Sequence, residues 1–307
     1  MVGCGVKASG VHPVGVRFGY GFCMITWQDV RTTTPFGELA ALQWGRPDAR
    51  PLLALHGWLD NAASFAAIAP DLADRRQIIA LDLPGHGHSA HAPPASRRYH
   101  VVDQVDHVLD FVDAMGWEHF DLMGHSLGAG IAALVAAAVP DRIDKLVLIE
   151  GLGPLGDDGS RTLSRWHDAH AHRMRAKHAP RVFGSVDAAV AARVSVGDLG
   201  AGEVRNIVER NLRRCAEGYM WRSDARLRLT TPVRMGERQI QRILTGIRAA
   251  TLLLLAEPAT SYLPTSLMKQ RAACVDDVHV ERIHGPHHLH VRCANDVAQR
   301  ISGFLAR

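Results

Sequence analysis

The chain has 307 residues, 47% of them hydrophobic, which suffices for one large core or for one core with a small appended domain. Its 35 lysines and arginines barely outnumber its 31 aspartates and glutamates, and no basic stripe stands out, which argues against a nucleic-acid-binding protein. The 5 cysteines are widely spread without CxxC spacing, which indicates reduced thiols in a cytoplasmic protein.

The N-terminal region divides into a leader and a hairpin. Residues 1–23 carry basic residues among scattered glycines without a compact apolar segment, so we expect a flexible leader and no secretory signal. Met24–Thr32 and Gly37–Gly45 flank the sequence TTPF, which predicts an antiparallel hairpin. The folded core is therefore expected to begin at about residue 24.

Further along the chain, short apolar runs alternate with glycine-bearing turns and with segments of helical periodicity. Most of the runs are apolar throughout, as expected of parallel strands that helices cover on both faces. The alternation predicts an α/β fold with a mostly parallel central sheet and helices on both of its faces. The predicted strands are Pro51–Leu55, Gln77–Leu81, Phe120–Met123, Lys145–Ile149, Thr251–Ala256 and Val278–Ile283.

Two helices are predicted between these strands. Apolar residues from Val102 to Met115 fall on one helical face, and Leu127–Val139 forms an alanine-rich, buried helix that Pro140 ends. The latter run is shorter than the roughly 20 residues that cross a bilayer, so no membrane span is expected.

Residues 152–235 interrupt the pattern. The stretch SRWHDAHAHRMRAKHAPRVF is basic and rich in histidine, later segments are helical and charged, and from residue 152 onward no strand signal appears until residue 251. We therefore predict a helical cap over 152–235, inserted where it could cover the ends of the sheet. The core then consists of residues 24–151 and 236–307.

The sequence DLMGHSLGAG contains a GxSxG motif centred on Ser126. A predicted strand ends at Met123 and a predicted helix starts at Leu127, so the serine lies on a strand-to-helix turn. Such a turn exposes the serine in a strained conformation, for which only glycine at the flanking sites leaves room. The helix N-terminus directs backbone N–H groups at an oxyanion formed beside Ser126.

A second turn, LALHGWLDNAASF, also follows a predicted strand directly. Its geometry can direct the backbone N–H of Trp58 toward an oxyanion, together with the N–H of Leu127. His56 is expected to be a structural hydrogen-bonding residue of the turn. In the next turn, DLPGHGHS, Asp82 is likewise expected to shape the backbone.

The sequence ERIHGPHHLH places several histidines after the last predicted strand. A general base that reaches Ser126 must lie in a loop beyond a strand end, and this loop qualifies. A metal site is not favoured, because no cysteine or carboxylate with ligand spacing accompanies the histidines.

The ordered set HGWLDNAASF, DLPGHGHS, GHSLGAG and GPHHLHV resembles the α/β-hydrolase fold family over about residues 24–307. Within that family the chain is most similar to the serine hydrolase-like proteins, with kinship to the haloalkane dehalogenase branch. The resemblance implies a Ser–acid–His triad in that order along the chain. It aligns Ser126 with the nucleophile and His287 with the catalytic histidine, while His288 and His290 fall on packing positions.

Two glutamates are candidates for the acid of the triad. In the branch that the chain resembles, the acid often follows the strand after the nucleophile helix. Here that strand lies in KLVLIEGLGP, and Glu150 is at its carboxyl end. A carboxylate that ends a buried strand is costly unless it is hydrogen-bonded, and a histidine is a natural partner. The alternative is Glu257, although it lies early in its loop and Ala259 stands where an aspartate would be expected.

A serine nucleophile fits attack on an acyl carbonyl, whereas the related dehalogenases and epoxide hydrolases carry an aspartate there. We therefore expect a cytoplasmic enzyme that hydrolyses a small or medium carboxylic ester, a small-molecule acyl substrate, without metal or cofactor. The same residues could instead cleave a thioester, lactone or C–C bond. A further alternative is a hydrolase-like binding protein without turnover. The sequence leaves substrate and oligomeric state open.

Overall fold

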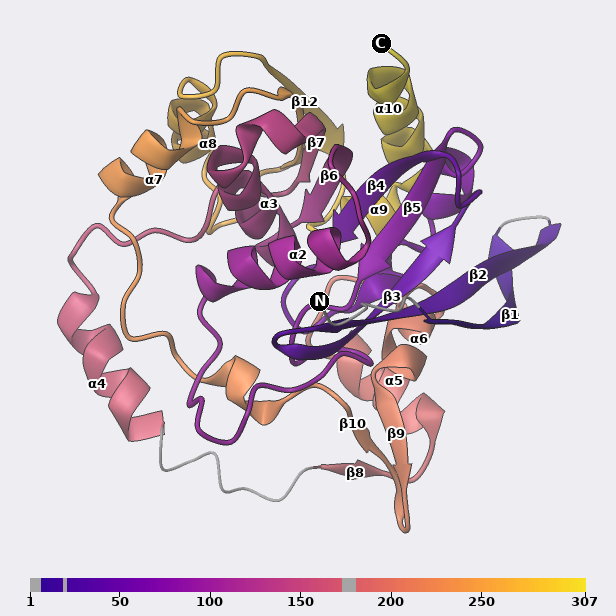
Figure 1. Ribbon diagram of the computed structural model, residues 1–307. Coiled ribbons are helices and arrows are strands. Elements are labelled where there is room, and N and C mark those ends of the chain that lie inside the picture. The colour runs from indigo at the N-terminus through magenta and orange to yellow at the C-terminus, as the bar shows by residue number, and fades with distance from the viewer. Residues whose placement is uncertain (1–6, 19–20, 173–180) are drawn as a thin grey trace.

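The computed structural model describes residues 7–18, 21–172 and 181–307 (Figure 1). Within these ranges a nine-stranded sheet has the order β1-β2-β3-β5-β4-β6-β7-β11-β12. Neighbouring strands from β5 to β12 in this order pair in parallel. Neighbouring strands from β1 to β3 pair antiparallel. The strands are β1 (Lys7–Phe18), β2 (Gly21–Thr34), β3 (Gly37–Trp44), β4 (Arg50–Leu55), β5 (Arg76–Leu81), β6 (Phe120–His125), β7 (Ile143–Ile149), β11 (Ala250–Glu257) and β12 (Val278–His284). The predicted α/β fold with its mostly parallel sheet is confirmed.

The predicted flexible leader is wrong over residues 7–18 and 21–23. Residues 7–18 form β1, which pairs antiparallel with β2, and β2 begins at Gly21 rather than Met24. The glycine content that suggested a flexible segment is compatible with a strand because the inter-strand hydrogen bonds are made by the backbone. Residues 1–6 and 19–20 lie outside the described residues.

Helices cover both faces of the sheet, and alternate residues of each strand supply the two resulting cores. Leu53 and Leu55 of β4 contribute to the core under α2, α3, α7 and α8, whereas Leu52 and Ala54 contribute to the core under α1 and α10. Strands buried on both faces must be apolar throughout, which explains why their sequences do not alternate. The helices are α1 (Ala69–Leu72), α2 (Asp103–Ala114), α3 (Leu127–Ala138), α7 (Glu237–Leu244), α8 (Thr265–Ala272), α9 (Leu289–Arg292) and α10 (Ala294–Ala306).

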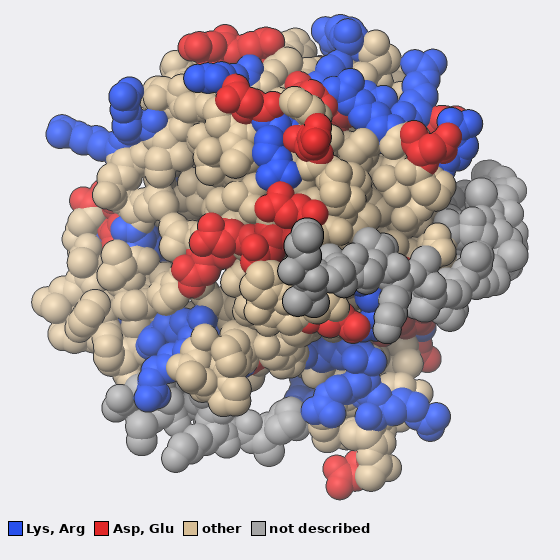
Figure 2. Space-filling model, in the orientation of Figure 1, with Lys and Arg blue, Asp and Glu red and all other residues tan. Residues whose placement is uncertain are grey.

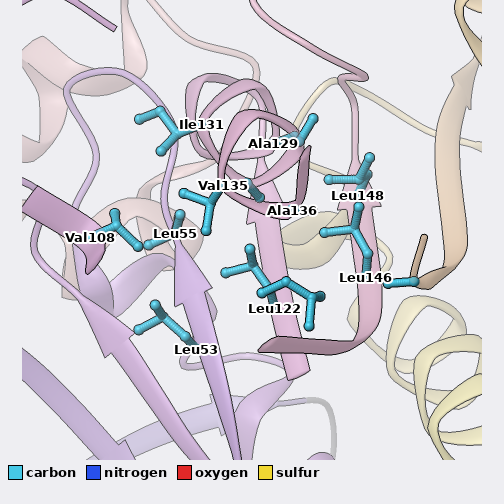
Figure 3. Close-up of a cluster of buried hydrophobic side chains, with 14 of the residues drawn as sticks. Leu53, Leu55, Val108, Leu122, Ala129, Ile131, Val135, Ala136, Leu146 and Leu148 are labelled. Carbon is cyan, nitrogen blue, oxygen red and sulfur yellow. The ribbon is translucent and has the colours of Figure 1, made fainter. Parts of the chain in front are cut away.

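Helix α3 lies at the centre of the first core. Figure 3 shows Ile131 and Val135 of this helix among Leu55, Leu122 and other strand side chains. Small residues dominate the remainder of α3, so its backbone approaches the sheet closely. This approach positions the residue that precedes the helix.

The segment 152–235 is only partly helical. It contains α4 (Thr162–His172), α5 (Val186–Val194) and α6 (Ala201–Arg210), but also a three-stranded sheet of β8 (Val182–Phe183), β10 (Gly218–Trp221) and β9 (Leu212–Cys215). The sequence analysis missed these strands because each is too short to show an apolar pattern. Figure 1 shows α5, α6 and β8–β10 gathered on one side of the main sheet, on the side opposite the C-terminal end of α10.

Ion pairs and hydrogen bonds attach this segment to the core. The buried guanidinium of Arg210 pairs with Asp82, at 3.0 Å from Nε to Oδ2, and with Asp29, at 3.0 Å from Nη1 to Oδ1. Tyr99 donates a hydrogen bond to Asp224, and Arg226 donates to core carbonyl groups, including that of Ser96. Asp82 also accepts hydrogen bonds from backbone amides of its own turn and of the turn after β4, as its predicted structural role requires.

The surface carries both signs of charge. On the face drawn in Figure 2, lysines and arginines are interspersed with aspartates and glutamates. In the part of the chain that the structure describes, no helix is both long and apolar enough to cross a membrane.

The contact between α3 and β4 gives a test of the packing. A Cβ at Gly128 would overlap the carbonyl oxygen of Leu55 and would lie 2.8 Å from that of His56. Because both neighbours are backbone atoms, we expect Gly128→Ala to lower the free energy of unfolding by about 3 kcal/mol, at the upper end of overpacking costs. Urea unfolding measures the change.

Gly202 provides the matched control. It lies on the exposed side of α6, and a Cβ there would meet nothing within 4 Å. Gly202→Ala should stabilise the protein by about 0.5–1 kcal/mol, because alanine costs less backbone entropy in a helix. Equal effects of the two substitutions would contradict the packing argument.

Candidate active site

Ser126 lies between β6 and α3 in a strained backbone conformation, with φ 52° and ψ −112°. Its amide donates to the carbonyl of Ile149 at 2.9 Å, and its carbonyl accepts from the amide of Gly130 at 3.0 Å. Non-glycine residues with positive φ cost roughly 1–3 kcal/mol and cluster at functional sites. Within the described ranges they are Leu59, Ser126 and Glu150.

The two motif glycines make this turn possible. A Cβ at Gly124 would overlap the carbonyl of Gly128, and one at Gly128 would overlap that of Leu55. The turn predicted from the GxSxG motif, with glycine required at both flanking sites, is therefore present.

Glu150 directly follows β7, and its buried carboxylate contacts His287. His287 Nδ1 lies 2.9 Å from Glu150 Oε2. Glu150 Oε1 accepts from the amide of Ala256 at 2.6 Å, and Oε2 accepts from the Thr260 hydroxyl at 3.3 Å. A carboxylate at Nδ1 selects the tautomer with the proton there, which leaves Nε2 of His287 as an acceptor.

The alternative acid does not make this contact. The side chain of Glu257 is 57% exposed and pairs with Arg282 at 3.3 Å. The structure thus brings Glu150, rather than Glu257, to His287. Ser126 and His287 line the same cavity.

The two residues predicted to supply backbone N–H donors lie at the start of α3 and in the turn after β4. Leu127 is the first residue of α3, a position whose N–H has no acceptor within its own helix. Trp58 follows β4 in the turn that lines the cavity, and its indole Nε1–H donates to the carbonyl of Leu227 at 3.0 Å. His56 has the predicted structural role, because Nδ1 donates to the Gly57 carbonyl and Nε2 accepts from the Leu83 amide.

His288, predicted as a packing residue, instead lies between two carboxylates. Nδ1 is 2.6 Å from Asp198 Oδ1, and Nε2 is 3.2 Å from Asp60 Oδ2. Burial opposes the charged ring, but the hydrogen bonds to Asp198 and Asp60 outweigh it and raise the pKa of His288 to about 9. Although burial alone would raise the pKa of Asp198, the hydrogen bond with His288 lowers it to about 2.

The other histidines of the cluster are buried and neutral. Burial lowers the pKa of His290 to about 3 and that of His125 well below its usual value, and neighbouring histidines add to both shifts. The ring centroids of His125 and His290 are 4.2 Å apart, so His290 has the predicted packing role. His125 Nε2 donates to the carbonyl of His287 at 3.1 Å.

The sequence analysis missed Asp60, Arg193 and Asp198 as members of this site. Arg193 Nη2 lies 3.0 Å from Asp60 Oδ1, and the side chain of Asp60 is 1% exposed. The sequence signal that could have indicated Asp60 was its position in the turn HGWLDN, directly after a predicted strand. Asp198 and Arg193 come from the segment 152–235, where no sequence pattern indicated contact with the site.

A cavity of about 1030 Å³ opens beside Ser126 and His287. Its walls come from the loops after β4, β6, β11 and β12 and from the segment 152–235, which contributes Phe183, Val208 and Trp221. A cavity of this size, with apolar walls and a few converging polar groups, is typical of a small-molecule site.

Comparisons with known proteins agree with this geometry. A family model described as the alpha/beta hydrolase fold matches residues 50–253. The chain is 28% identical to a serine hydrolase-like protein of Danio rerio, over 90% of this chain and 88% of that protein. It is 28% identical to a probable serine hydrolase of Drosophila melanogaster, over 91% and 88% of the respective lengths. The crystal structure of the hypothetical protein PA1622 from Pseudomonas aeruginosa PAO1 superposes with a TM-score of 0.84 at 35% identity, over 91% of this chain and 99% of that one.

The ion pairs of His288 predict a pH-dependent stability. The pKa is raised from about 6.5 in the unfolded chain to about 9, so the stabilisation is complete below about pH 6.5 and is lost as the pH rises through 9. Asp198→Asn should therefore lower the free energy of unfolding strongly at pH 6.5 and only weakly at pH 10. Urea unfolding across this range measures the difference.

Asp187→Asn is the control, because this exposed carboxylate pairs with Arg205, which keeps its charge throughout the range. Its effect should be small and independent of pH. A destabilisation by Asp198→Asn that stays constant from pH 6.5 to 10 would refute the charged state of His288.

Proposed function

The chain belongs to the alpha/beta hydrolase fold family, and we propose that it is a serine hydrolase that cleaves a small or medium carboxylic ester through Ser126, His287 and Glu150. The observation that carries the proposal is the 2.9 Å contact between His287 Nδ1 and the buried carboxylate of Glu150. A buried carboxylate on a histidine that shares a cavity with a strained serine is the arrangement of nucleophilic acyl transfer.

The first half of the proposed reaction forms an acyl-enzyme. Nε2 of His287 accepts the proton of the Ser126 hydroxyl while Oγ attacks the carbonyl carbon of the ester. The imidazolium then gives this proton to the departing alcohol, which leaves Ser126 acylated. Glu150 stabilises the imidazolium and keeps Nδ1 protonated, so that Nε2 can act as the base.

The second half repeats these steps with water. His287 accepts a proton from water, the resulting hydroxide attacks the acyl-enzyme, and the proton returns to Ser126 Oγ as the acid is released. The N–H groups of Trp58 and Leu127 would stabilise the oxyanion in both halves, and one such donor is typically worth about 3 kcal/mol.

The segment 152–235 is proposed as a cap that shapes the substrate. Phe183, Val208 and Trp221 give the cavity an apolar wall, which suits the acyl or alcohol chain of an uncharged ester. Because this wall is attached to the core through Arg210 and Asp82, the cap is held over the carboxyl ends of the strands.

The triad assignment is tested by replacing each member in an assay with p-nitrophenyl esters of increasing chain length and with a fluorophosphonate probe. Ser126→Ala should abolish labelling and lower kcat/KM by about 10³-fold or more, because no other nucleophile is present at the turn. Glu150→Gln should lower kcat by roughly 10²–10⁴-fold, because the amide no longer fixes the tautomer or stabilises the imidazolium.

Glu257→Gln is the matched control, since Glu257 ends the neighbouring strand and is exposed. It should leave kcat and labelling unchanged. A loss confined to Glu257→Gln would move the acid to that residue. A folded wild-type protein that neither labels nor turns over any oxyester would refute ester hydrolysis, and turnover of thioesters alone would move the proposal to another acyl bond.

A further inference from the structure

Three buried side chains beside the proposed triad present converging donor atoms. Asp60 follows β4, His125 ends β6 and His288 follows β12, and one ligand-type atom from each lies within 4.8 Å of the other two. In the sequence, Asp60 and His288 are 228 positions apart. The sequence argument against a metal had looked for a carboxylate within the histidine tract, whereas the fold supplies one from the distant turn.

One of the three side chains has a nitrogen without a partner. Nδ1 of His125 is buried and makes no hydrogen bond with any residue that the structure describes. Buried polar atoms are nearly always satisfied, so an orphaned imidazole nitrogen needs an explanation. The space in front of it is left by Gly57, because a Cβ there would lie 2.9 Å from His125 Nδ1 and 3.3 Å from Asp60 Oδ2.

In each of the three side chains, the other nitrogen or oxygen atom already has a hydrogen-bond or ion-pair partner. His125 Nε2 donates to the His287 carbonyl at 3.1 Å, which directs the lone pair of Nδ1 inward. His288 Nδ1 lies 2.6 Å from Asp198, and Asp60 Oδ1 lies 3.0 Å from Arg193. Metal-binding histidines typically donate their second nitrogen to a carbonyl or carboxylate in this way, which fixes the ring.

We propose that Asp60, His125 and His288 form a site for a divalent transition-metal ion, for which Zn²⁺ is the best fit. Two imidazoles and one carboxylate with a fourth open position are a common zinc donor set. Ligand atoms about 2.0–2.1 Å from a tetrahedral zinc lie roughly 3.4 Å from one another. Asp60 Oδ2 and His288 Nε2 are already 3.2 Å apart, and the ion would replace the proton that they share.

The ion would oppose the proposed reaction. The His287 ring centroid lies 4.8 Å from that of His125 and 5.5 Å from that of His288. His287 must become cationic when it takes the proton of Ser126, and a nearby divalent ion disfavours that charge. Zinc binding should therefore inhibit hydrolysis, a consequence that rests on the proposed function, whereas the binding itself does not.

Binding is tested directly on the full chain without an affinity tag, after removal of metals with a chelator. Titration with Zn²⁺ in a calorimeter should give an ion bound at this site, and Co²⁺ at the same site should give the visible absorption of a tetrahedral complex. Asp60→Asn, His125→Gln and His288→Gln should each weaken binding by more than about 100-fold, beyond the roughly 10–100-fold loss that removal of an outer-sphere contact causes. Circular dichroism and thermal unfolding check that each variant is folded.

His290→Gln is the matched control. His290 is buried in the same cluster, with its ring centroid 4.2 Å from that of His125, but it is not among the three ligands. It should bind zinc like the wild type. Absence of binding, or an affinity that His290→Gln lowers as much as the ligand variants do, would overturn the proposal.

The hydrolysis assay provides the second readout. Zn²⁺ should inhibit the wild type reversibly, with chelator restoring the rate, and inhibition should be at least about tenfold weaker in Asp60→Asn at equal zinc. If no ester is hydrolysed, the binding measurements still decide on the site. If hydrolysis proceeds and folded protein binds no zinc, the metal site alone is refuted.

Discussion

The close approach of α3 to β4 and β6 is the constraint from which the site is built. Glycine at positions 124 and 128 lets the helix backbone lie against the strand carbonyl groups, where any Cβ would overlap. The chain can then leave β6 and enter α3 only through a residue at positive φ, which is Ser126 at 52°. The packing of the core thus exposes this serine, since the cores on both sides of the sheet hold the strained turn in place.

Parallel strands bring the other groups to the same edge of the sheet. Glu150 follows β7, Asp60 follows β4, and His287 and His288 follow β12, so residues far apart in the chain meet at one site, where Asp60, His287 and His288 line the cavity. Charges buried there are stable because they are paired, as in Glu150 with His287 and in His288 with Asp60 and Asp198. Neutral His125 and His290 fill the space between the pairs.

The residues of the site differ in how well the sequence predicts them. The sequence favours Glu150 over Glu257 because the acid often follows this strand in the branch that the chain resembles, and because a carboxylate that ends an apolar, buried strand needs a partner such as a histidine. The sequence predicts only a packing role for His288, because its two carboxylate partners come from other loops. One of them, Asp198, belongs to a segment without a regular pattern. The sequence did not predict strands β1 and β8–β10 for a related reason, since short or glycine-rich strands show no periodic pattern of apolar residues.

The sequence by itself determined the α/β fold, the order along the chain of its parallel strands, the strained serine turn and, together with the family resemblance, the candidate acid, because each follows from local pattern or from the cost of burying charge. Only the tertiary structure decided which loops meet. It joined Glu150 to His287, placed Asp60 and Asp198 on His288, and left Nδ1 of His125 without a partner. Contacts between distant loops depend on the order of strands in the sheet and on the packing of the inserted segment, and neither leaves a trace in the spacing of residues.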